Sequence, residues 1–341
     1  MLRMILALLI ALAAVLVSGP RVIPFLRRLH FGQTIYDLGP QSHKKKQGTP
    51  IMGGLMIAGG VLLASLICHP ARWQGVWDFT LALLGVSLLS MAVGFGDDFI
   101  KAVLKRHEGL TPWQKIAGQV ISAVAFSAYC YFHPQVGPSV IVPFLNVEWN
   151  LGIFYIPLMS LTVIFIVNST NLQDGVDGLL SSVTAVGSTA WAAIALFMLM
   201  AVQAAHPEYA SNLGSVAVFA MALVGATLGF LRFNHYPATV FMGDTGSMFI
   251  GGAVVGMAML LRQPLLLVFI AFTPIMSSLS VIIQRYYFKA THGKRIFKMS
   301  PIHHHFELSG YSETQIVRMY AIVTAVLSLI AVLSLYGLQL T

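Results

Sequence analysis

Charged residues are scarce in this chain of 341 residues: Asp, Glu, Lys and Arg make up 9% of it, whereas hydrophobic residues make up 57%. A soluble domain carries roughly 25% charged residues. A chain so poor in charge could not cover a surface that faces water, so its solvent must be lipid. The net charge of +8 then reports topology, because Lys and Arg stay on the cytoplasmic side of membranes. It does not indicate a nucleic-acid partner.

Cysteine is nearly absent, with only Cys68 and Cys130 in the chain. Two cysteines offer neither a disulfide framework nor the clustered spacing of a metal site. Both fall near the expected outer ends of helices, where a bridge stays open as an alternative but free thiols packed among helices are favoured. The sequence also lacks a Walker A motif, a glycine-rich strand-to-helix turn and a nucleophilic triad.

Apolar segments long enough to cross a bilayer, about 20 residues each, recur along the whole chain. They predict an all-α integral membrane protein with a single polytopic domain over residues 1–341. The first segment is followed by Arg27 and Arg28, which favours a retained helix over a cleaved signal peptide. About ten such segments are expected, near residues 2–26, 51–68, 76–95, 116–132, 151–167, 179–202, 211–231, 239–261, 265–288 and 316–338.

Basic residues are distributed unequally between alternate loops. Of the 20 Lys and Arg, only Arg3, Arg72 and Arg262 fall in one set of loops. The positive-inside rule makes this set external, so both termini are expected outside. The external segment 139–149 alternates loosely, which is consistent with a short β-hairpin. In the last internal loop, residues 285–297 mix basic and apolar side chains, as in an amphipathic helix that lies at the membrane interface.

Acidic residues are also rare, yet five of the 12 fall in internal loops beside apolar helices: Asp97, Asp98, Asp174, Asp177 and Asp244. A carboxylate at bilayer depth costs up to roughly 2.5–3.5 kcal/mol, so it needs a partner or a task. Helix capping would explain Asp177 or Asp244 taken alone. Five carboxylates on one side of the membrane favour a cation site, and without thiolates they suit Mg²⁺, Mn²⁺ or Ca²⁺. Some are then expected to bind substrate or to orient the others.

Glycines and lysines surround these aspartates. Glycine lets a backbone approach a phosphate closely, although it also serves helix packing in membranes. Lys101 and Lys105 would share a helix face one turn beyond the Asp97-Asp98 pair. Topology and anionic headgroups explain some of these cations, and attraction of phosphates would explain others. The glycines are Gly94, Gly96, Gly175, Gly178, Gly243 and Gly246.

Three consecutive histidines, His303, His304 and His305, lie in the last internal loop. Neighbouring side chains on a chain point apart and cannot all bind one ion, so a zinc site is disfavoured. A phosphate contact or a structural hydrogen bond is the preferred interpretation.

Taken together, five segments resemble the polyprenyl-phosphate N-acetylhexosamine-1-phosphate transferase superfamily. Within it the chain is similar to the phospho-N-acetylmuramoyl-pentapeptide transferase family, because related GlcNAc-1-phosphate transferases vary in the triple-histidine segment. The segments are KKKQGTPIMGG at 44–54, GFGDD at 94–98, NSTNLQDGVDGL at 168–179, FNHYPATVFMGDTGS at 233–247 and PIHHHFE at 301–307.

The resemblance implies a reaction, its substrates and a place. Phospho-MurNAc-pentapeptide would pass from UDP-MurNAc-pentapeptide to undecaprenyl phosphate, with release of UMP and formation of lipid I. The implied cofactor is Mg²⁺, for which Mn²⁺ is expected to substitute. The site would face the cytoplasm from the bacterial cytoplasmic membrane, and a homodimer is left open.

The resemblance also implies roles for single residues. Asp244 is the expected Mg²⁺ ligand, with Asp97 and Asp98 as further candidates, and Phe241 would stack on uridine. The expected catalytic residues are Asp97, Asp98, Lys101, Lys105, Asp244 and His303. The expected substrate-binding residues are Lys44, Thr49, Asn168, Asn171, Asp174, Asp177, Asn234, Phe241, Gly243, His304 and His305.

Two other functions compete with this interpretation. The nearest is a sister transferase that uses UDP-GlcNAc, which a substrate panel would separate. The more distant one is an ion-coupled transporter, since intramembrane aspartates often mark an ion path. A transporter should carry its carboxylates near the middle of the membrane, whereas these five are expected at one end of their helices.

Overall fold

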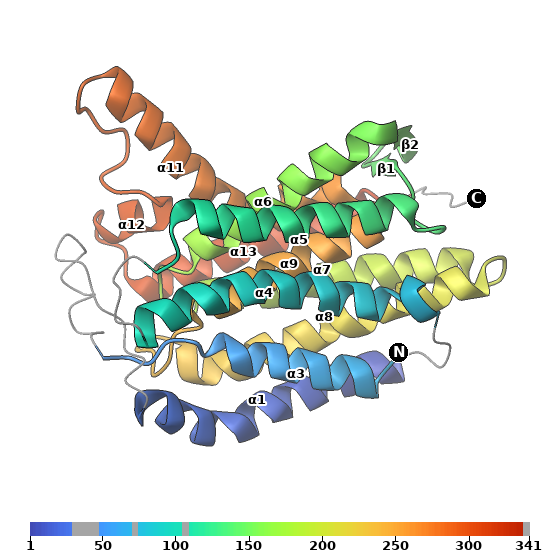
Figure 1. Ribbon diagram of the computed structural model, residues 1–341, viewed down its shortest axis with the longest axis horizontal. Coiled ribbons are helices and arrows are strands. Elements are labelled where there is room, and N and C mark those ends of the chain that lie inside the picture. The colour runs from blue at the N-terminus through green and yellow to red at the C-terminus, as the bar shows by residue number, and fades with distance from the viewer. Residues whose placement is uncertain (29–47, 70–73, 104–108, 337–341) are drawn as a thin grey trace.

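The computed structural model describes residues 1–28, 48–69, 74–103 and 109–336 (Figure 1). Long helices lie side by side and form one bundle, with a small hairpin at one end. The long helices are α1 (Leu2–Arg28), α3 (Gly54–Ile67), α4 (Phe79–Val103), α5 (Pro112–Phe132), α6 (Tyr155–Gln173), α7 (Leu179–Val202), α8 (Pro207–Asn234), α9 (Gly243–Leu260), α11 (Phe272–Ala290) and α13 (Glu313–Leu333).

Every predicted apolar segment coincides with one of these helices, except that the segment at 265–288 covers α11 and the short helical residues 264–270 before it. The multi-pass all-α membrane class is confirmed. A count of ten spanning helices is not reached, because seven described helices are long and apolar enough to cross a membrane. An eighth results if residues 264–270 and 272–290, which meet at 83°, are taken as one bent span. The helix α3 has 14 residues and is roughly 21 Å long, short of a hydrocarbon core of about 30 Å.

Two helices begin with capping boxes. The hydroxyl of Thr111 accepts a hydrogen bond from Gln114 N at 3.3 Å, and the side chain of Gln114 accepts one from Thr111 N at 3.0 Å. Ser312 and Gln315 form the same motif at the start of α13. Such caps satisfy N–H groups that have no partner inside the helix, so they fix where α5 and α13 begin.

The helix α9 lies at the centre of the bundle. Within its spanning stretch 89% of the residues are buried, against 22% for α1. It packs against α4, α6 and α3 through glycines that bring the helices close together. A Cβ added at Gly251 would lie 2.5 Å from Thr170 Oγ1 on α6, and one at Gly252 would lie 2.8 Å from Ser90 Oγ on α4. The middle of α9 therefore packs closely against α6 and α4.

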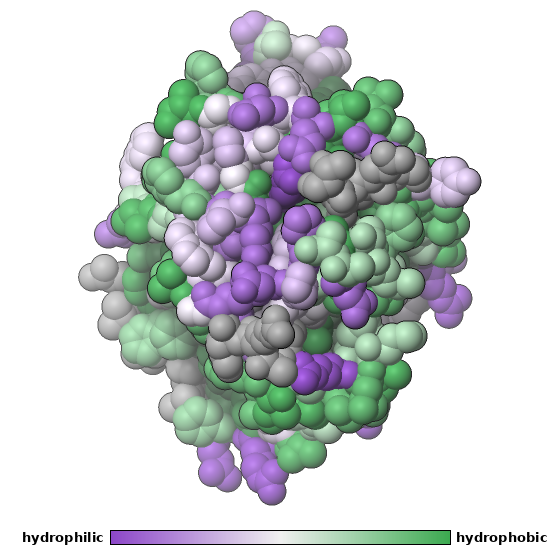
Figure 2. Space-filling view, turned by 90° about the vertical axis from the view of Figure 1, so that its right-hand side faces the viewer, coloured by the Kyte–Doolittle hydropathy of each residue, from purple (hydrophilic) through white to green (hydrophobic). Residues whose placement is uncertain are grey.

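The hairpin predicted within residues 139–149 is present. Its strands β1 (Ser139–Val142) and β2 (Val147–Asn150) pair antiparallel, with Val140 opposite Trp149. Arg262, just after α9, anchors it: Ile141 N donates to Arg262 O at 2.8 Å, and Arg262 Nη2 lies 2.5 Å from Glu148 Oε2. We call this the hairpin end of the bundle. Figure 2 looks onto it and shows hydrophilic residues in the middle with hydrophobic ones around them.

The predicted interfacial helix over residues 285–297 does not form as a separate element. Residues up to Ala290 continue α11, which slants away from the bundle at the end opposite the hairpin (Figure 1). The following residues turn back because Gln284 Oε1 accepts hydrogen bonds from Ile296 N and Phe297 N at 3.1 and 3.0 Å. The short helix in this loop is instead α12 (Ile302–Glu307).

Cys68 and Cys130 are both buried and free, as expected.

Candidate active site

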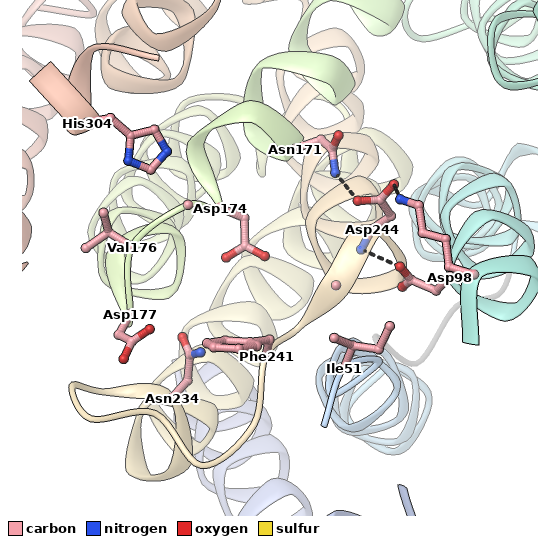
Figure 3. A pocket seen from close by; sticks show the side chains of 13 residues that line it. Ile51, Asp98, Asn171, Asp174, Val176, Asp177, Asn234, Phe241, Asp244 and His304 are labelled. Carbon is pink, nitrogen blue, oxygen red and sulfur yellow. Dashed lines mark hydrogen bonds and ion pairs between the residues drawn. The ribbon is translucent and has the colours of Figure 1, made fainter. Parts of the chain in front are cut away.

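A polar cavity of about 290 Å³ opens at the end of the bundle opposite the hairpin. Most binding pockets are lined mainly by apolar groups, so a lining this rich in charge favours a charged ligand. Figure 3 shows side chains from α4, α6, α8 and α9 converging on it. The predicted site residues that line it are Asp98, Lys101, Asn171, Asp174, Asp177, Asn234, Phe241, Gly243, Asp244 and His304.

Three carboxylates meet at one side of this cavity. Asp97 and Asp98 lie in the last turns of α4, and Asp244 lies in the first turn of α9. Each offers an oxygen, and these atoms all lie within 4.8 Å of one another. Lys101 Nζ lies 2.5 Å from Asp97 Oδ2 and 3.7 Å from Asp244 Oδ2. Lys115 Nζ, from α5, lies 2.6 Å from Asp244 Oδ2. The two lysines offset part of the repulsion between the carboxylates.

Asp98 supplies the cap that α9 lacks locally. The N-cap residue Met242 makes no side-chain cap hydrogen bond. Asp98 Oδ1 accepts from Asp244 N at 3.2 Å, and Asp98 Oδ2 accepts from Thr245 N at 2.9 Å and from Thr245 Oγ1 at 2.6 Å. The approach needs Gly243, whose φ is +69° and where a Cβ would lie 2.5 Å from Asp98 Oδ2. Asp98 thus fixes the backbone that carries Asp244.

The three carboxylates fit a hard divalent ion. Asp97 Oδ1 accepts from Leu110 N at 2.9 Å, and the facing oxygens of Asp97 and Asp244 otherwise meet lysine ammonium groups. Carboxylate oxygens without thiolates are the ligands that Mg²⁺ and Mn²⁺ take. Among the residues described, this is the one group of at least three His, Cys, Asp or Glu close enough to hold a metal ion.

Asn168 and Asn171, one helical turn apart on α6, have different surroundings. Asn171 Nδ2 donates to Asp244 Oδ1 at 2.7 Å and to Ser247 Oγ at 2.9 Å, at the edge of the cavity. Asn168 pairs with Gln119 of α5, donating at 2.8 Å and accepting at 3.2 Å. Asn168 was predicted to contact substrate. It lies instead in a contact between α5 and α6 and is not part of the cavity lining.

Asp177 and Asn234 hold loops together around the cavity. Asp177 Oδ2 accepts from Ala238 N at 2.9 Å. Asn234 Oδ1 accepts from Gly178 N at 3.1 Å, and Asn234 Nδ2 donates to Val240 O at 3.0 Å. The N-cap of α7 is Gly178 and carries no side-chain cap. Helix capping, the simple explanation for Asp177 and Asp244, therefore does not hold.

Phe241 lines the cavity between Asn234 on one side and Asp98 on the other (Figure 3). Its backbone is paired with the segment before α3: Phe241 N donates to Pro50 O at 2.8 Å, and Gly53 N donates to Phe241 O at 2.9 Å. Thr49 directly precedes this pairing but is absent from the cavity lining. Lys44 and Lys105 lie outside the described residues.

The three histidines point in different directions, as expected for neighbours. His304 lines the cavity, and its Nδ1 lies 2.5 Å from Glu307 Oε2. His303 is fully buried with its ring against Gly175, where a Cβ would lie 2.4 Å from Nε2. His305 Nδ1 accepts from Lys298 N at 3.1 Å. They do not form a common metal site.

Sequence reasoning missed several residues of the site. One is Lys115, which lies four residues after the Thr111 cap, in the first turn of α5. Thr245 and Ser247 follow Asp244 directly, and both hydroxyls take part in its hydrogen-bond network. Glu307 lies three residues after His304, the spacing that brings helical neighbours together.

Asp174 lines the cavity, and its carboxyl group points into it (Figure 3). Burial, followed by the nearby charges of Asp244, Asp98 and Asp177, raises the pKa of Asp174 to about 8 from 3.8. The protonated form is therefore favoured in the folded protein in the absence of metal.

We expect Asp174→Asn to flatten the pH dependence of stability in chelator-treated protein. A carboxyl group with a raised folded pKa stabilises the fold fully below its unfolded pKa of about 4, and that contribution is lost as the pH rises through about 8. Thermal unfolding in detergent between about pH 4 and pH 9 measures this, with wild type losing more stability than the variant. Parallel curves would contradict the assignment.

Comparison with known proteins matches residues 80–262 to the model of glycosyl transferase family 4. Phospho-N-acetylmuramoyl-pentapeptide-transferase of Clostridium novyi is 42% identical over 334 residues, covering 97% of this chain and 97% of that protein. The proteins of the same name from Oceanobacillus iheyensis and Clostridioides difficile are 43% and 44% identical, each covering 96% of this chain. The chain is a multi-pass membrane enzyme that belongs to the phospho-N-acetylmuramoyl-pentapeptide-transferase family.

Proposed function

We propose that the protein transfers phospho-MurNAc-pentapeptide from UDP-MurNAc-pentapeptide to undecaprenyl phosphate, releasing UMP and forming lipid I. The main support is the polar cavity lined by Asp98, Lys101 and Asp244, with Asp97 and Lys115 directly beside these residues. Relatives more than 40% identical along nearly the whole chain bear the name of this transferase. The two substrates are a soluble nucleotide and a lipid phosphate, which can meet only at the membrane surface.

The proposed cofactor is Mg²⁺, with Mn²⁺ able to replace it. Asp244 would hold it, together with Asp97 or Asp98, because their oxygens lie within 4.8 Å of one another. When bound, the ion would neutralise negative charge on the phosphates. Lys101 and Lys115 would contribute to the same end, since they already lie against Asp97 and Asp244.

Direct attack by the lipid phosphate is the favoured route. A phosphate monoester has a second pKa near 6, so at neutral pH its oxygen is mostly ionised and a general base adds little. Asp97 would then orient Lys101 and hold the loop before α5, through Leu110 N, and would not need to remove a proton. Exchange of labelled UMP into the UDP-linked substrate without lipid would instead require a covalent enzyme intermediate.

We assign the nucleotide to the opposite side of the cavity. Phe241 presents an aromatic ring there, and Asn234, Asp174 and Asp177 surround it with amide and carboxyl groups (Figure 3). His304 would lie on the phosphate side, supported by Glu307. Lys44 is a further proposed contact near the nucleotide or sugar, and Lys105 is a further proposed catalytic residue.

For topology we propose ten membrane segments in a single domain, with both termini outside and the cavity facing the cytoplasm. Seven long helices and the bent pair give eight of these segments, and the short α3 and the more polar α5 would be the other two, packed against longer neighbouring helices. The membrane would be the bacterial cytoplasmic membrane. Native mass spectrometry of the solubilised protein tests the homodimer that the resemblance leaves open.

Release of UMP tests the proposed function directly. Purified protein in detergent is given UDP-MurNAc-pentapeptide, with and without undecaprenyl phosphate and Mg²⁺, and parallel reactions contain UDP-GlcNAc. UMP release that needs the first nucleotide, the lipid and the metal ion supports the proposal. Release from UDP-GlcNAc alone would favour the sister transferase. Movement of a sugar-lipid across vesicles without UMP would favour a transporter.

A further inference from the structure

The turn between α6 and α7, residues 174–178, forms one wall of the cavity. Asp174 and Asp177 of this turn line the cavity. Its backbone is held by side chains that are distant in sequence: Asp177 N donates to Glu313 Oε2 at 3.1 Å, and Gly178 N donates to Asn234 Oδ1 at 3.1 Å. Two successive N–H groups that no helix satisfies thus find acceptors elsewhere in the fold.

Glu313 is placed unusually for a carboxylate. It is the first residue of α13, it is 8% exposed, and it does not line the cavity. A buried carboxylate is costly unless it is paired or hydrogen-bonded. The bond from Asp177 N supplies part of that compensation, and the positive end of the α13 dipole supplies more. Such a bond is stronger and more directional than one between neutral groups.

A small apolar cluster brings the same two elements together. Val176 of the turn and Leu179 at the start of α7 pack against Ile316 and Tyr320 of α13. This cluster is separate from the main core of the bundle, and Phe306 of α12 packs against it. Val176 is only 4% exposed and also lines the cavity, so it belongs both to this cluster and to the cavity wall. The cluster sets the distance between turn and helix, and the Glu313 bond sets the orientation of the turn.

We propose that Glu313 is a positioning residue for the nucleotide side of the cavity, acting through the backbone of Asp177. This rests on the proposed function, in which the turn contacts the UDP-linked substrate. Glu313 touches no substrate in this scheme. It holds the N–H of Asp177 so that the carboxyl groups of Asp174 and Asp177 keep their places in the wall.

Three variants in the first turn of α13 separate positioning from simple stability. Glu313→Ala removes the acceptor, whereas Glu313→Gln keeps a carbonyl oxygen at the same reach. Gln315→Ala is the matched control, because Gln315 caps the same helix but faces Ser312 instead of the turn. Steady-state kinetics with each substrate varied in turn, and equilibrium binding of UMP by calorimetry, are measured for all of them.

We expect Glu313→Ala to raise KM for the UDP-linked substrate and Kd for UMP by about tenfold or more, since a hydrogen bond to a charged group is lost. The KM for lipid phosphate should change by less than about threefold, and Glu313→Gln should recover most of the affinity. An equal loss in Gln315→Ala, or a Glu313→Ala variant with wild-type UMP affinity, would overturn the inference. If wild type itself bound no UMP, the proposed function would fail instead.

Discussion

Asp244→Asn is expected to lower the turnover number by at least about 10³-fold. The carboxylate of Asp244 accepts from Asn171 Nδ2 on one oxygen and from Lys115 Nζ on the other, and Lys101 lies 3.7 Å away. An amide in either orientation points its NH₂ group at one of these donors. The substitution therefore removes a candidate ligand charge and also turns an attractive contact into a repulsive one. UMP release at increasing Mg²⁺ concentration measures the effect.

The control for this experiment is Asp78→Asn. Asp78 is also buried, and its Oδ2 lies 2.9 Å from His69 Nε2. It lies between η1 (Gly75–Trp77) and the first residue of α4, away from the cavity. Activity per folded molecule should stay near that of wild type. Turnover by Asp244→Asn within a few-fold of wild type, at ordinary Mg²⁺ concentrations, would remove Asp244 from the ligand set.

Gly94→Ala is expected to lower turnover by on the order of 10²-fold, although Gly94 itself carries no functional group. Gly94 lies one turn before the Asp97-Asp98 pair on α4, and a Cβ there would lie 2.2 Å from Asp244 O. That oxygen is backbone and cannot rotate away, so α4 and α9 must separate. The separation would stretch the cap from Asp98 to Thr245 and displace Asp244. A misplacement of about 1 Å at a reacting centre costs roughly this much in rate.

Gly85→Ala is the matched control for Gly94→Ala. Gly85 lies on the same helix, and a Cβ added there would meet nothing within 4 Å. Alanine favours helix over glycine by roughly 0.5–1 kcal/mol, so this variant should be as stable as wild type or more so. Both are assayed well below their unfolding temperatures. Equal activity in the two variants would show that the α4–α9 contact tolerates a methyl group and does not position Asp244.

Helix positions were predictable because lipid imposes a simple rule on composition. Each apolar stretch of about 20 residues became a helix or a bent pair. The rule could not tell which helices span unaided. Helix α3 is short, and α5 carries the polar residues Gln114 and Lys115 in its first turn. Interhelical packing, which a single sequence does not reveal, decides how such helices sit beside longer neighbours.

The rarity of aspartates and their position in internal loops predicted that they would lie close together. Which contacts each aspartate makes could not be predicted. Asp97 and Asp98 are adjacent, so they point to different sides of α4. One meets Lys101, and the other caps α9 from about 146 positions away in the sequence. Asn168 and Asn171 differ for the same reason, since Gln119 of another helix happens to face only the first. Contacts of this range depend on the packed fold.

The two walls of the cavity belong to separate apolar units, and this has a mechanical consequence. The wall with Asp244 is built into the main core around α9, whereas the wall with Val176 belongs to the small cluster beneath α12 and α13. A small unit opens at a lower free-energy cost than a large one. A bulky substrate would therefore enter and leave by displacing the α12–α13 side, while the carboxylates on the α4–α9 side keep their geometry throughout the cycle.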